Sequence, residues 1–327
     1  MNRTAAAVRD VGALWARWMR RRRLKGVLDR WGDDFVLVMV VVPNVVHLAI
    51  PALRLLNRCG QVLVLGNGLR AWEFEWLRRE FPHLHVEQMT TAPQTIPHGE
   101  VMELVAAVTL GNFGFVDPDC YVFSADVFGC LTTAAETSYV AAPFWLENTA
   151  LELDVPDTFF IGINGKSLAH LKTRYGVAFG VTDTLPRALA QRVEAKWRAT
   201  PDLHPHPWKT YYDTAHAVTL AGAVEGMAMG RVASRPGDLF HVCGTSYHQT
   251  NLRRPGEQEL YVVNAHYFHL ELLKRTTHPR VLEEFAAMKD YYGGGDGLLR
   301  SHREYADSQT HDDTRQLLAK LASEGVI

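Results

Sequence analysis

The sequence has few cysteines, and none of them has the spacing of a metal or redox motif. The 327-residue chain contains Cys59, Cys120, Cys130 and Cys243, and no two of them form a C-x-x-C motif. This spacing argues against a zinc ribbon and a thioredoxin-type site. We expect buried free thiols in a reducing compartment.

Long apolar runs and an excess of charge are also missing. The longest apolar run covers residues 35–43, whereas a helix needs about 20 apolar residues to cross a bilayer. Arginines interrupt the first apolar positions, so a secretory signal is not expected. The 34 basic and 36 acidic residues give a formal net charge of -2, which argues against a generally basic nucleic-acid-binding protein. We expect a cytoplasmic protein that at most lies peripherally on the inner face of a membrane.

Two glycine-rich phosphate-binding motifs are absent as well. Gly66-Asn67-Gly68 lacks the third glycine and the helix of a dinucleotide fingerprint, so NAD is not an expected cofactor. Residues 42–47 follow the first expected strand and lack the glycine- and lysine-rich loop that a nucleotidyltransferase needs.

What is present is the pattern of a large α/β domain, in which strands alternate with helices and form a mostly parallel sheet. Residues 35–42 form a continuous apolar, β-branched run, typical of a strand buried on both faces. We expect a catalytic domain at 35–251, preceded by a helical segment at 1–34 and followed by a helical extension at 252–327. Strands are expected at 35–42, 61–65, 85–87, 113–116, 120–123, 158–163 and 239–242, and helices at 46–58, 70–80, 98–110, 167–175, 213–229 and 257–290.

Residues 5–31 predict a basic amphipathic helix. Val8, Val11, Trp15 and Trp18 recur on one face. The surrounding basic residues are Arg17, Arg20, Arg21, Arg22, Arg23 and Lys25. Two interpretations remain open: the helix lies on an anionic membrane surface, or it packs on the domain with a solvated charged face.

The strongest chemical signal is Asp117-Pro118-Asp119, which follows the apolar residues 113–116. The carboxyl edge of a parallel sheet is where ligands bind, and carboxylate oxygens suit Mg²⁺ or Mn²⁺. The alternative is a surface turn in which Asp117 caps its own backbone.

His241, at the end of a short expected strand, is a candidate nitrogen ligand, and the small residues after it could approach an anion. A structural histidine is the other interpretation.

In this order of elements the chain resembles the glycosyltransferases of the GT-A fold over roughly residues 35–251. The resemblance is carried by Pro43-Asn44, Gly66-Asn67-Gly68, Asp117-Pro118-Asp119 and His241-Val242-Cys243-Gly244-Thr245-Ser246. It implies a GT-A-like, Rossmann-like fold, a nucleotide-diphosphate sugar as donor, and an acceptor that is a glycan, a lipid or a small molecule. It also implies a divalent metal, Mn²⁺ or Mg²⁺.

The resemblance also implies roles for individual residues. Asp117 and Asp119 become metal or ribose contacts, and His241 becomes a metal or diphosphate contact. The implied nucleotide contacts are Pro43, Asn44, Asn67, Asp117, Lys209, Gly244 and Ser246. The acidic residue that usually follows the second strand is missing from Gly66-Asn67-Gly68, which leaves the contacts to the nucleobase open.

An inverting transferase needs a carboxylate base for the acceptor hydroxyl, and the sequence offers two candidates. Asp213 opens the helix expected at 213–229, where the alternative role is its N-cap. Glu147 is a rival base or a sugar-hydroxyl contact, with a surface carboxylate as the alternative. The expected function is thus a metal-dependent, hexosyltransferase-like glycosyltransferase. The alternatives are a nucleotidyltransferase of related fold and an inactive protein that binds a membrane surface or a partner.

Overall fold

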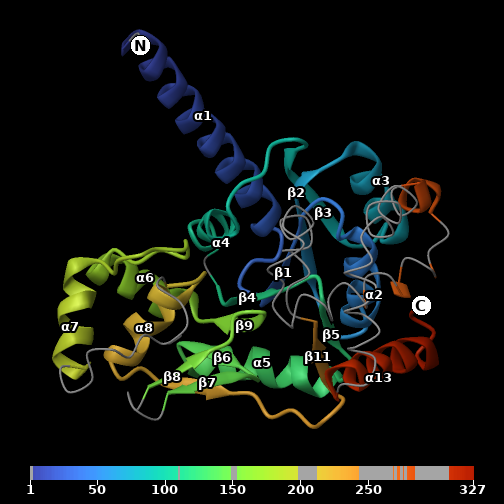
Figure 1. The fold of residues 1–327 in the computed structure, drawn as a ribbon. Helices are drawn as coiled ribbons and strands as arrows, with labels where there is room; N and C mark the ends of the chain where they lie inside the picture. Colours follow the sequence, from blue (N-terminus) through green and yellow to red (C-terminus); the bar gives the residue numbers. More distant parts are fainter. Residues whose placement is uncertain are drawn as a thin grey trace, which may run out of the picture.

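The computed structural model is built around a seven-stranded sheet with the order β10-β6-β9-β4-β1-β2-β3 (Figure 1). It describes residues 3–109, 111–148, 153–197, 212–242, 268, 271–272, 275, 278–283 and 309–327. Strand β9 runs antiparallel to its neighbours β4 and β6, and the other paired strands are parallel. This mostly parallel sheet, flanked by helices, confirms the expected α/β class.

The sheet strands are β1 (Val36–Val41), β2 (Val62–Leu69), β3 (His85–Thr91), β4 (Phe113–Val116), β6 (Val140–Ala142), β9 (Phe160–Ile163) and β10 (Met229–Arg231). Two antiparallel pairs lie outside it, β5 (Cys120–Val122) with β11 (Leu239–His241), and β7 (Trp145–Asn148) with β8 (Leu153–Pro156). The helices are α1 (Arg3–Leu28), α2 (Val46–Leu56), α3 (Ala71–Glu80), α4 (His98–Ala106), α5 (Ala125–Thr137), α6 (Gly165–Tyr175), α7 (Arg187–Trp197), α8 (His216–Val224) and α13 (Gln309–Ser323).

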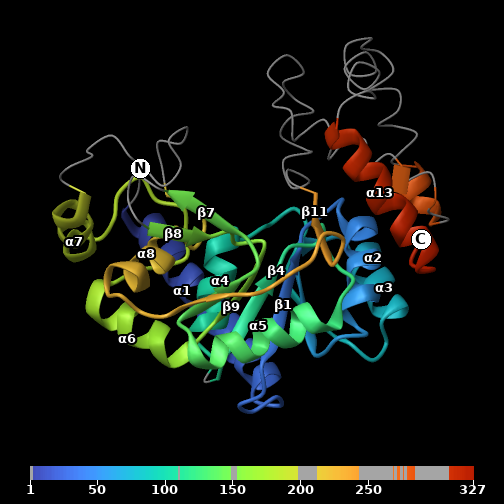
Figure 2. The ribbon, with the colours of Figure 1, turned by 90° about the horizontal axis from the view of Figure 1, so that it is seen from below.

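Strand β1 is buried on both faces, as its sequence predicts. Leu37, Met39 and Val41 belong to one core cluster, and Val36 and Val38 belong to another. Because successive side chains of a strand point to opposite faces, the two clusters cover the two sides of the sheet. Helices α2, α3, α5 and α13 contribute to the first cluster, and α4, α6, α7 and α8 contribute to the second (Figures 1 and 2).

Several elements differ from the expectation. The segment Gly66-Asn67-Gly68 does not close β2; it lies inside the strand, where the pairing with β3 shifts register twice. The bulge suits Gly68, whose φ of 82° favours glycine. Helix α8 begins at His216 with Ala215 as its N-cap, so the helix starts later than the pattern predicts. Helices α5 and α7 were not expected at all.

The cysteines only partly follow the prediction of buried thiols. Cys120 is buried, Cys59 is partly buried and Cys130 is exposed, and each of the three is a thiol that is not part of a disulfide. Cys130 lies away from the core side of α5, which presents Val127 and Leu131 to the first cluster. Cys243 lies outside the described residues. In the part of the chain that the structure describes, helices long and apolar enough to cross a membrane are absent.

Candidate metal centre

The segment Asp117-Pro118-Asp119 leaves the sheet at the carboxyl end of β4. The backbone N–H of Asp117 donates to the carbonyl of Phe159 at 2.8 Å, and the N–H of Cys120 donates back to the carbonyl of Asp117 at 3.1 Å. These bonds close a tight turn between β4 and β5. The turn holds both carboxylates at the sheet edge where parallel sheets bind ligands.

Pairing of β5 with β11 brings His241 to this turn. His241 lies opposite Cys120 in the antiparallel register, and the N–H of Val242 donates to the carbonyl of Asp119 at 3.1 Å. The imidazole stacks on the ring of Phe159, with centroids 3.9 Å apart and planes 17° apart. Backbone pairing and ring stacking together fix the imidazole beside the carboxylates.

The three side chains converge as metal ligands do. The Nε2 atom of His241 lies 3.5 Å from Oδ1 of Asp119 and 3.9 Å from Oδ2 of Asp117. Two ligands held at about 2.1 Å from one octahedral ion are about 3.0 Å apart when adjacent and about 4.2 Å when opposite. The measured separations fall within that range, so one cation fits among the three. Within the described parts of the chain, this is the only group of three or more His, Cys, Asp and Glu side chains whose ligand atoms all lie within 4.8 Å of one another.

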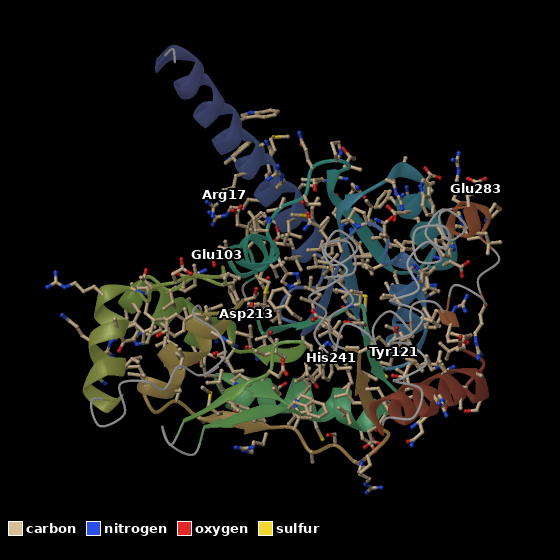
Figure 3. The ribbon with its side chains drawn as sticks, in the orientation of Figure 1. Arg17, Glu103, Tyr121, Asp213, His241 and Glu283 are labelled. Carbon is tan, nitrogen blue, oxygen red and sulfur yellow. The ribbon has the colours of Figure 1, made fainter. Side chains whose placement is uncertain are left out.

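Exposure differs between the two carboxylates. The Asp119 side chain is 5% exposed, whereas that of Asp117 is 36% exposed. Asp119 is thus an interior anchor, and Asp117 is the more accessible of the two carboxylates. His241 and Asp213 both lie in the central part of the molecule (Figure 3).

Negative charge is concentrated around Asp117. Although part of the Asp117 side chain reaches solvent, the surrounding protein removes much of the water from its carboxyl group. This desolvation, and then the neighbouring carboxylate of Asp119, raise the pKa of Asp117 to about 7. Asp157 and Asp213 raise this pKa further, and His241 lowers it. Such crowding is unfavourable when every carboxylate is ionised, and a bound cation would relieve it.

Asp213 contributes to the same electrostatic field, but it does not cap α8. Its Oδ1 accepts from the N–H of Thr214 at 2.8 Å, and its own N–H donates to Nδ1 of His216 at 3.1 Å. The N-cap position belongs to Ala215, without a side-chain cap bond. The N-cap alternative for Asp213 is therefore wrong, because the helix starts at His216, three residues later than its apolar pattern suggests.

His98, which the sequence did not single out, belongs to these surroundings. It is the first residue of α4. Burial lowers the pKa of His98, and the negative charge of Asp213 partly opposes this effect. A single histidine between a proline and a glycine carries no motif, so only the fold could reveal its place.

Several predicted site residues cannot be assigned side-chain contacts. Glu147 pairs through its backbone with Asp154 in the β7–β8 ladder, but its side chain lies outside the described part. Lys209, Gly244 and Ser246 also lie outside the described residues. The roles of these four residues stay predictions.

The segment Pro43-Asn44 is held by an acidic residue that the sequence analysis missed. Glu73, which is fully buried, accepts from the N–H of Asn44 at 2.7 Å and from the N–H of Arg70 at 2.9 Å. The guanidinium of Arg70 donates to Glu73 at 2.7 Å and to Oδ1 of Asn44 at 2.6 Å. An acidic residue after β2 thus exists, displaced into the first turn of α3, where it joins the ends of β1 and β2.

Asn67, a predicted nucleotide contact, has its polar atoms occupied by the protein. Its amide donates to the carbonyl of Ile96 at 2.7 Å, and its Oδ1 accepts from the N–H of Ile96 at 2.8 Å. Thr90 donates to the same oxygen at 3.3 Å. With a 2% exposed fraction, the Asn67 side chain holds the loop before α4.

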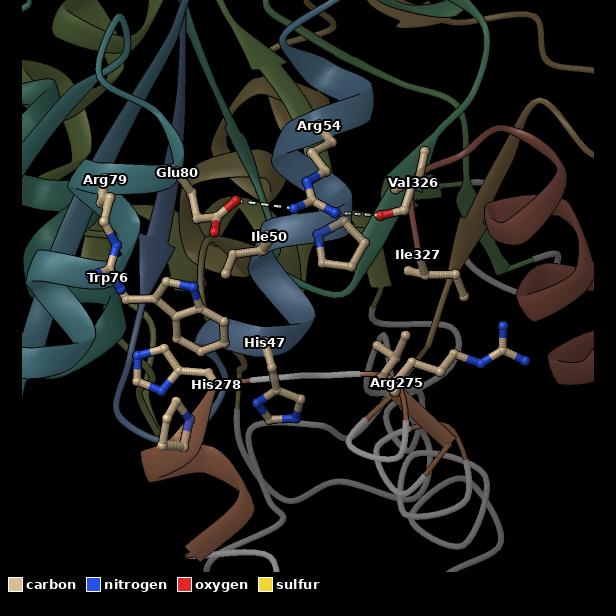
Figure 4. A pocket seen from close by; sticks show the side chains of 13 residues that line it. His47, Ile50, Arg54, Trp76, Arg79, Glu80, Arg275, His278, Val326 and Ile327 are labelled. Carbon is tan, nitrogen blue, oxygen red and sulfur yellow. Dashed lines mark hydrogen bonds and ion pairs between the residues drawn. The ribbon is translucent and has the colours of Figure 1, made fainter.

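A cavity of about 360 Å³ lies elsewhere, lined by α2, α3, the residues around His278 and the last two residues of the chain (Figure 4). Arg54 crosses it and donates to Glu80 at 3.0 Å and to the carbonyl of Val326 at 2.7 Å. The imidazole of His278 stacks on Trp76 at 4.3 Å between centroids. The lining drawn from the described residues lacks Asp117, Asp119 and His241, so this cavity is separate from the metal centre.

A family of known proteins matches part of the chain. The profile of the StrH glycosyltransferase N-terminal domain matches residues 22–168. This span holds Asp117 and Asp119, whereas Asp213 and His241 follow it. None of the curated protein sequences matches the chain.

Among solved structures, the chain is similar to the mannosyltransferase PcManGT from Pyrobaculum calidifontis, which was solved with GDP-Man and Mn²⁺. The sequence identity is 12% and the TM-score is 0.41, over 97% of this chain and 96% of the other. The family match confirms the resemblance expected from the sequence. Residues 22–168, less than half of the chain, are thus similar to the StrH glycosyltransferase N-terminal domain.

Proposed function

We propose that the protein transfers a hexosyl group from a nucleotide-diphosphate sugar to an acceptor hydroxyl, with Mn²⁺ or Mg²⁺ held by Asp117, Asp119 and His241. The observation that carries this proposal is the convergence of these three side chains at the carboxyl edge of the sheet. Two carboxylate oxygens and one imidazole nitrogen suit both ions, Mn²⁺ more than Mg²⁺ because of the nitrogen.

The reaction breaks the bond between the anomeric carbon and the diphosphate oxygen, and it forms a bond to the acceptor oxygen. The bonding pair leaves with the nucleoside diphosphate, and a base takes the acceptor proton. A divalent cation at this centre supplies Lewis-acid stabilisation of the departing diphosphate. Asp119 and His241 hold their positions through backbone pairing, so the centre needs little rearrangement during the reaction.

We assign the role of base in an inverting reaction to Asp213. Its carboxylate acts electrostatically on both Asp117 and His98, which supports a position beside the metal centre. Asp213 lies before α8 and does not cap it. Glu147 remains the rival candidate. The variants Asp213→Asn and Glu147→Gln distinguish the two residues, because the variant that lacks the base should lose turnover and keep its affinity for the donor.

The proposal is tested by incubating the full chain with a panel of nucleotide-diphosphate sugars and mixed acceptors, and by measuring release of nucleoside diphosphate. Mn²⁺- or Mg²⁺-dependent turnover is expected, with a loss of at least about 100-fold in Asp119→Asn. Glu136→Gln, which neutralises an exposed carboxylate at the far end of α5, is the matched control and should keep full turnover. Release of pyrophosphate, or full turnover by Asp119→Asn, would contradict the proposal.

A further inference from the structure

Helix α1 exposes large apolar side chains to solvent. Trp15, Trp18 and Met19 are 64%, 52% and 41% exposed. Figure 1 shows the first part of α1 projecting away from the body of the molecule. Most large exposed apolar side chains of the described chain stand singly, but these lie within about one turn of a single helix.

The exposed stripe and the packed face lie on opposite sides of α1. Leu24, Val27 and Leu28 are buried in the second core cluster. At about 100° per residue, Leu24 lies about 180° around the helix from Trp15, and Trp18 and Met19 flank Trp15. The residues that pack on the domain are therefore not the tryptophan stripe that the sequence pattern singles out.

Polar contacts fix this orientation. Arg21 donates to the carbonyl of Ala107, which follows α4, at 3.0 Å, and Arg23 forms an ion pair with Glu87 on β3. Rotation of α1 to bury its tryptophans would break both contacts and expose Leu24. The stripe is thus held outward by the fold.

The charges around the exposed stripe indicate the kind of surface that the stripe contacts. The basic residues of α1 are Arg3, Arg9, Arg17, Arg20, Arg21, Arg22, Arg23 and Lys25, and Asp10 is its single acidic residue. The guanidinium of Arg22 lies over the ring of Trp18, at 5.4 Å from the centroid. Amphipathic tryptophans beside arginines suit the boundary between lipid headgroups and acyl chains, where the arginines meet anionic headgroups.

We propose that the outward face of α1 binds an anionic lipid surface. A second copy of this chain is a poorer occupant, because it would bring two strongly basic helices together. The proposal does not depend on the reaction assigned to the metal centre.

The test is flotation of the full chain with vesicles of phosphatidylcholine alone and of phosphatidylcholine mixed with phosphatidylglycerol. We expect salt-sensitive binding to the anionic vesicles and much weaker binding to the neutral ones. The double variant Trp15→Ser/Trp18→Ser should lose about tenfold or more in affinity, and Arg17→Gln/Arg22→Gln should lose the preference for anionic lipid. Val181→Ser, which removes an equally exposed apolar side chain (58% exposed), should bind like the wild type.

Equal flotation of the wild type and the tryptophan variant would overturn the proposal, and so would absence of binding to both vesicles. Sedimentation velocity without lipid provides the third outcome. A dimer that the tryptophan variant disperses would assign the stripe to self-association and also overturn it. The variants should unfold at the same temperature as the wild type, which would show that they are folded.

Discussion

At the scale of single residues, the chemistry of the site depends on how the protein tolerates two neighbouring carboxylates. Asp119 is anchored in the interior, and the partly exposed Asp117 has its pKa raised to about 7. Protons and metal ions therefore compete for the same oxygen. This competition makes the metal affinity of the centre depend on pH.

The first prediction concerns this pH dependence. The ordinary pKa of the Asp117 carboxyl is 3.8, and in the folded chain it is about 7. Between these values the folded state binds more protons than the unfolded state, so the contribution of Asp117 to the free energy of unfolding falls as pH rises through this window. Calorimetric Mn²⁺ affinity should rise over the same window and level off above pH 7.

In Asp117→Asn the stability difference between pH 4 and pH 7 should shrink, and the weaker Mn²⁺ binding that remains should depend less on pH. An Mn²⁺ affinity of the wild type that stays constant from pH 5 to pH 8 would contradict the shifted pKa.

The second prediction concerns the buried carboxylate of Glu73. In Glu73→Gln the amide NH₂ group faces backbone N–H donors and Arg70 loses its anionic partner. We expect a loss of about 2 kcal/mol in the free energy of unfolding, measured by urea denaturation. Glu75→Gln, an exposed change on the same helix, should leave the midpoint unchanged. Equal midpoints for both variants would refute the structural role of Glu73.

Residue patterns revealed part of this site. Asp117-Pro118-Asp119 could be recognised because apolar residues flank the carboxylates. Its approach to His241 depends on the pairing of β5 with β11, which joins positions far apart in the sequence. Glu73 gave no signal because a glutamate in the first turn of a helix is ordinary.

At the scale of elements, close contacts decide which helix packs where. Gly222 of α8 lies against Tyr139, so that a Cβ atom there would come within 2.1 Å of the ring. The Tyr139 hydroxyl donates to the carbonyl of Val218 at 2.9 Å. The ring is thus fixed on α8 and cannot move aside without losing this bond.

The third prediction follows from this contact. Gly222→Ala gains helix propensity of about 1 kcal/mol, but the clash with a buried ring should outweigh it and leave a net loss of about 1–3 kcal/mol. The matched control is Gly129→Ala in α5, where a Cβ atom has nothing within 4 Å, and it should be neutral or stabilising. Urea denaturation of both variants tests the difference. A Gly222→Ala protein as stable as Gly129→Ala would disprove the close packing.

The sequence predicts elements best where the apolar pattern is strong. Strand β1 and helix α2 lie within two residues of their expected bounds. Helix α5 escaped prediction because Gly129, Thr132 and Thr133 are poor helix formers, and tertiary packing of one apolar face decides its structure. The bulge in β2 escaped because two glycines beside an asparagine are more typical of a turn.

At the scale of the whole molecule, the end of the chain is part of the first core. We expected a helical extension after residue 251, and within it α13 contributes Leu317, Leu318 and Leu321 to the first cluster. Lys320 donates to the carbonyl of Gly237 and lies over the ring of Phe123, at 4.5 Å from the centroid. This helix therefore covers the segment between the sheet and β11.

The fourth prediction is that α13 unfolds together with the sheet. Leu321 is 0% exposed, and Leu321→Ala should lower the free energy of unfolding by about 2–5 kcal/mol. Near-ultraviolet and far-ultraviolet circular dichroism should report one shared transition at a lower temperature. A separate early transition, with the main midpoint unchanged, would show that α13 is an independent appendage.

The fifth prediction tests the central claim, that Asp117, Asp119 and His241 together hold a cation for a nucleotide-diphosphate ligand. The measurement is thermal unfolding of the full chain with UDP, GDP, ADP, CDP and dTDP, each with and without Mn²⁺. A ligand that binds only the native state raises the melting temperature. At least one nucleotide should stabilise the wild type only when Mn²⁺ is present, and Asp119→Asn should abolish this effect while Glu136→Gln keeps it. Stabilisation of equal size in Asp119→Asn, or no Mn²⁺-dependent stabilisation by any of the five, would contradict the account.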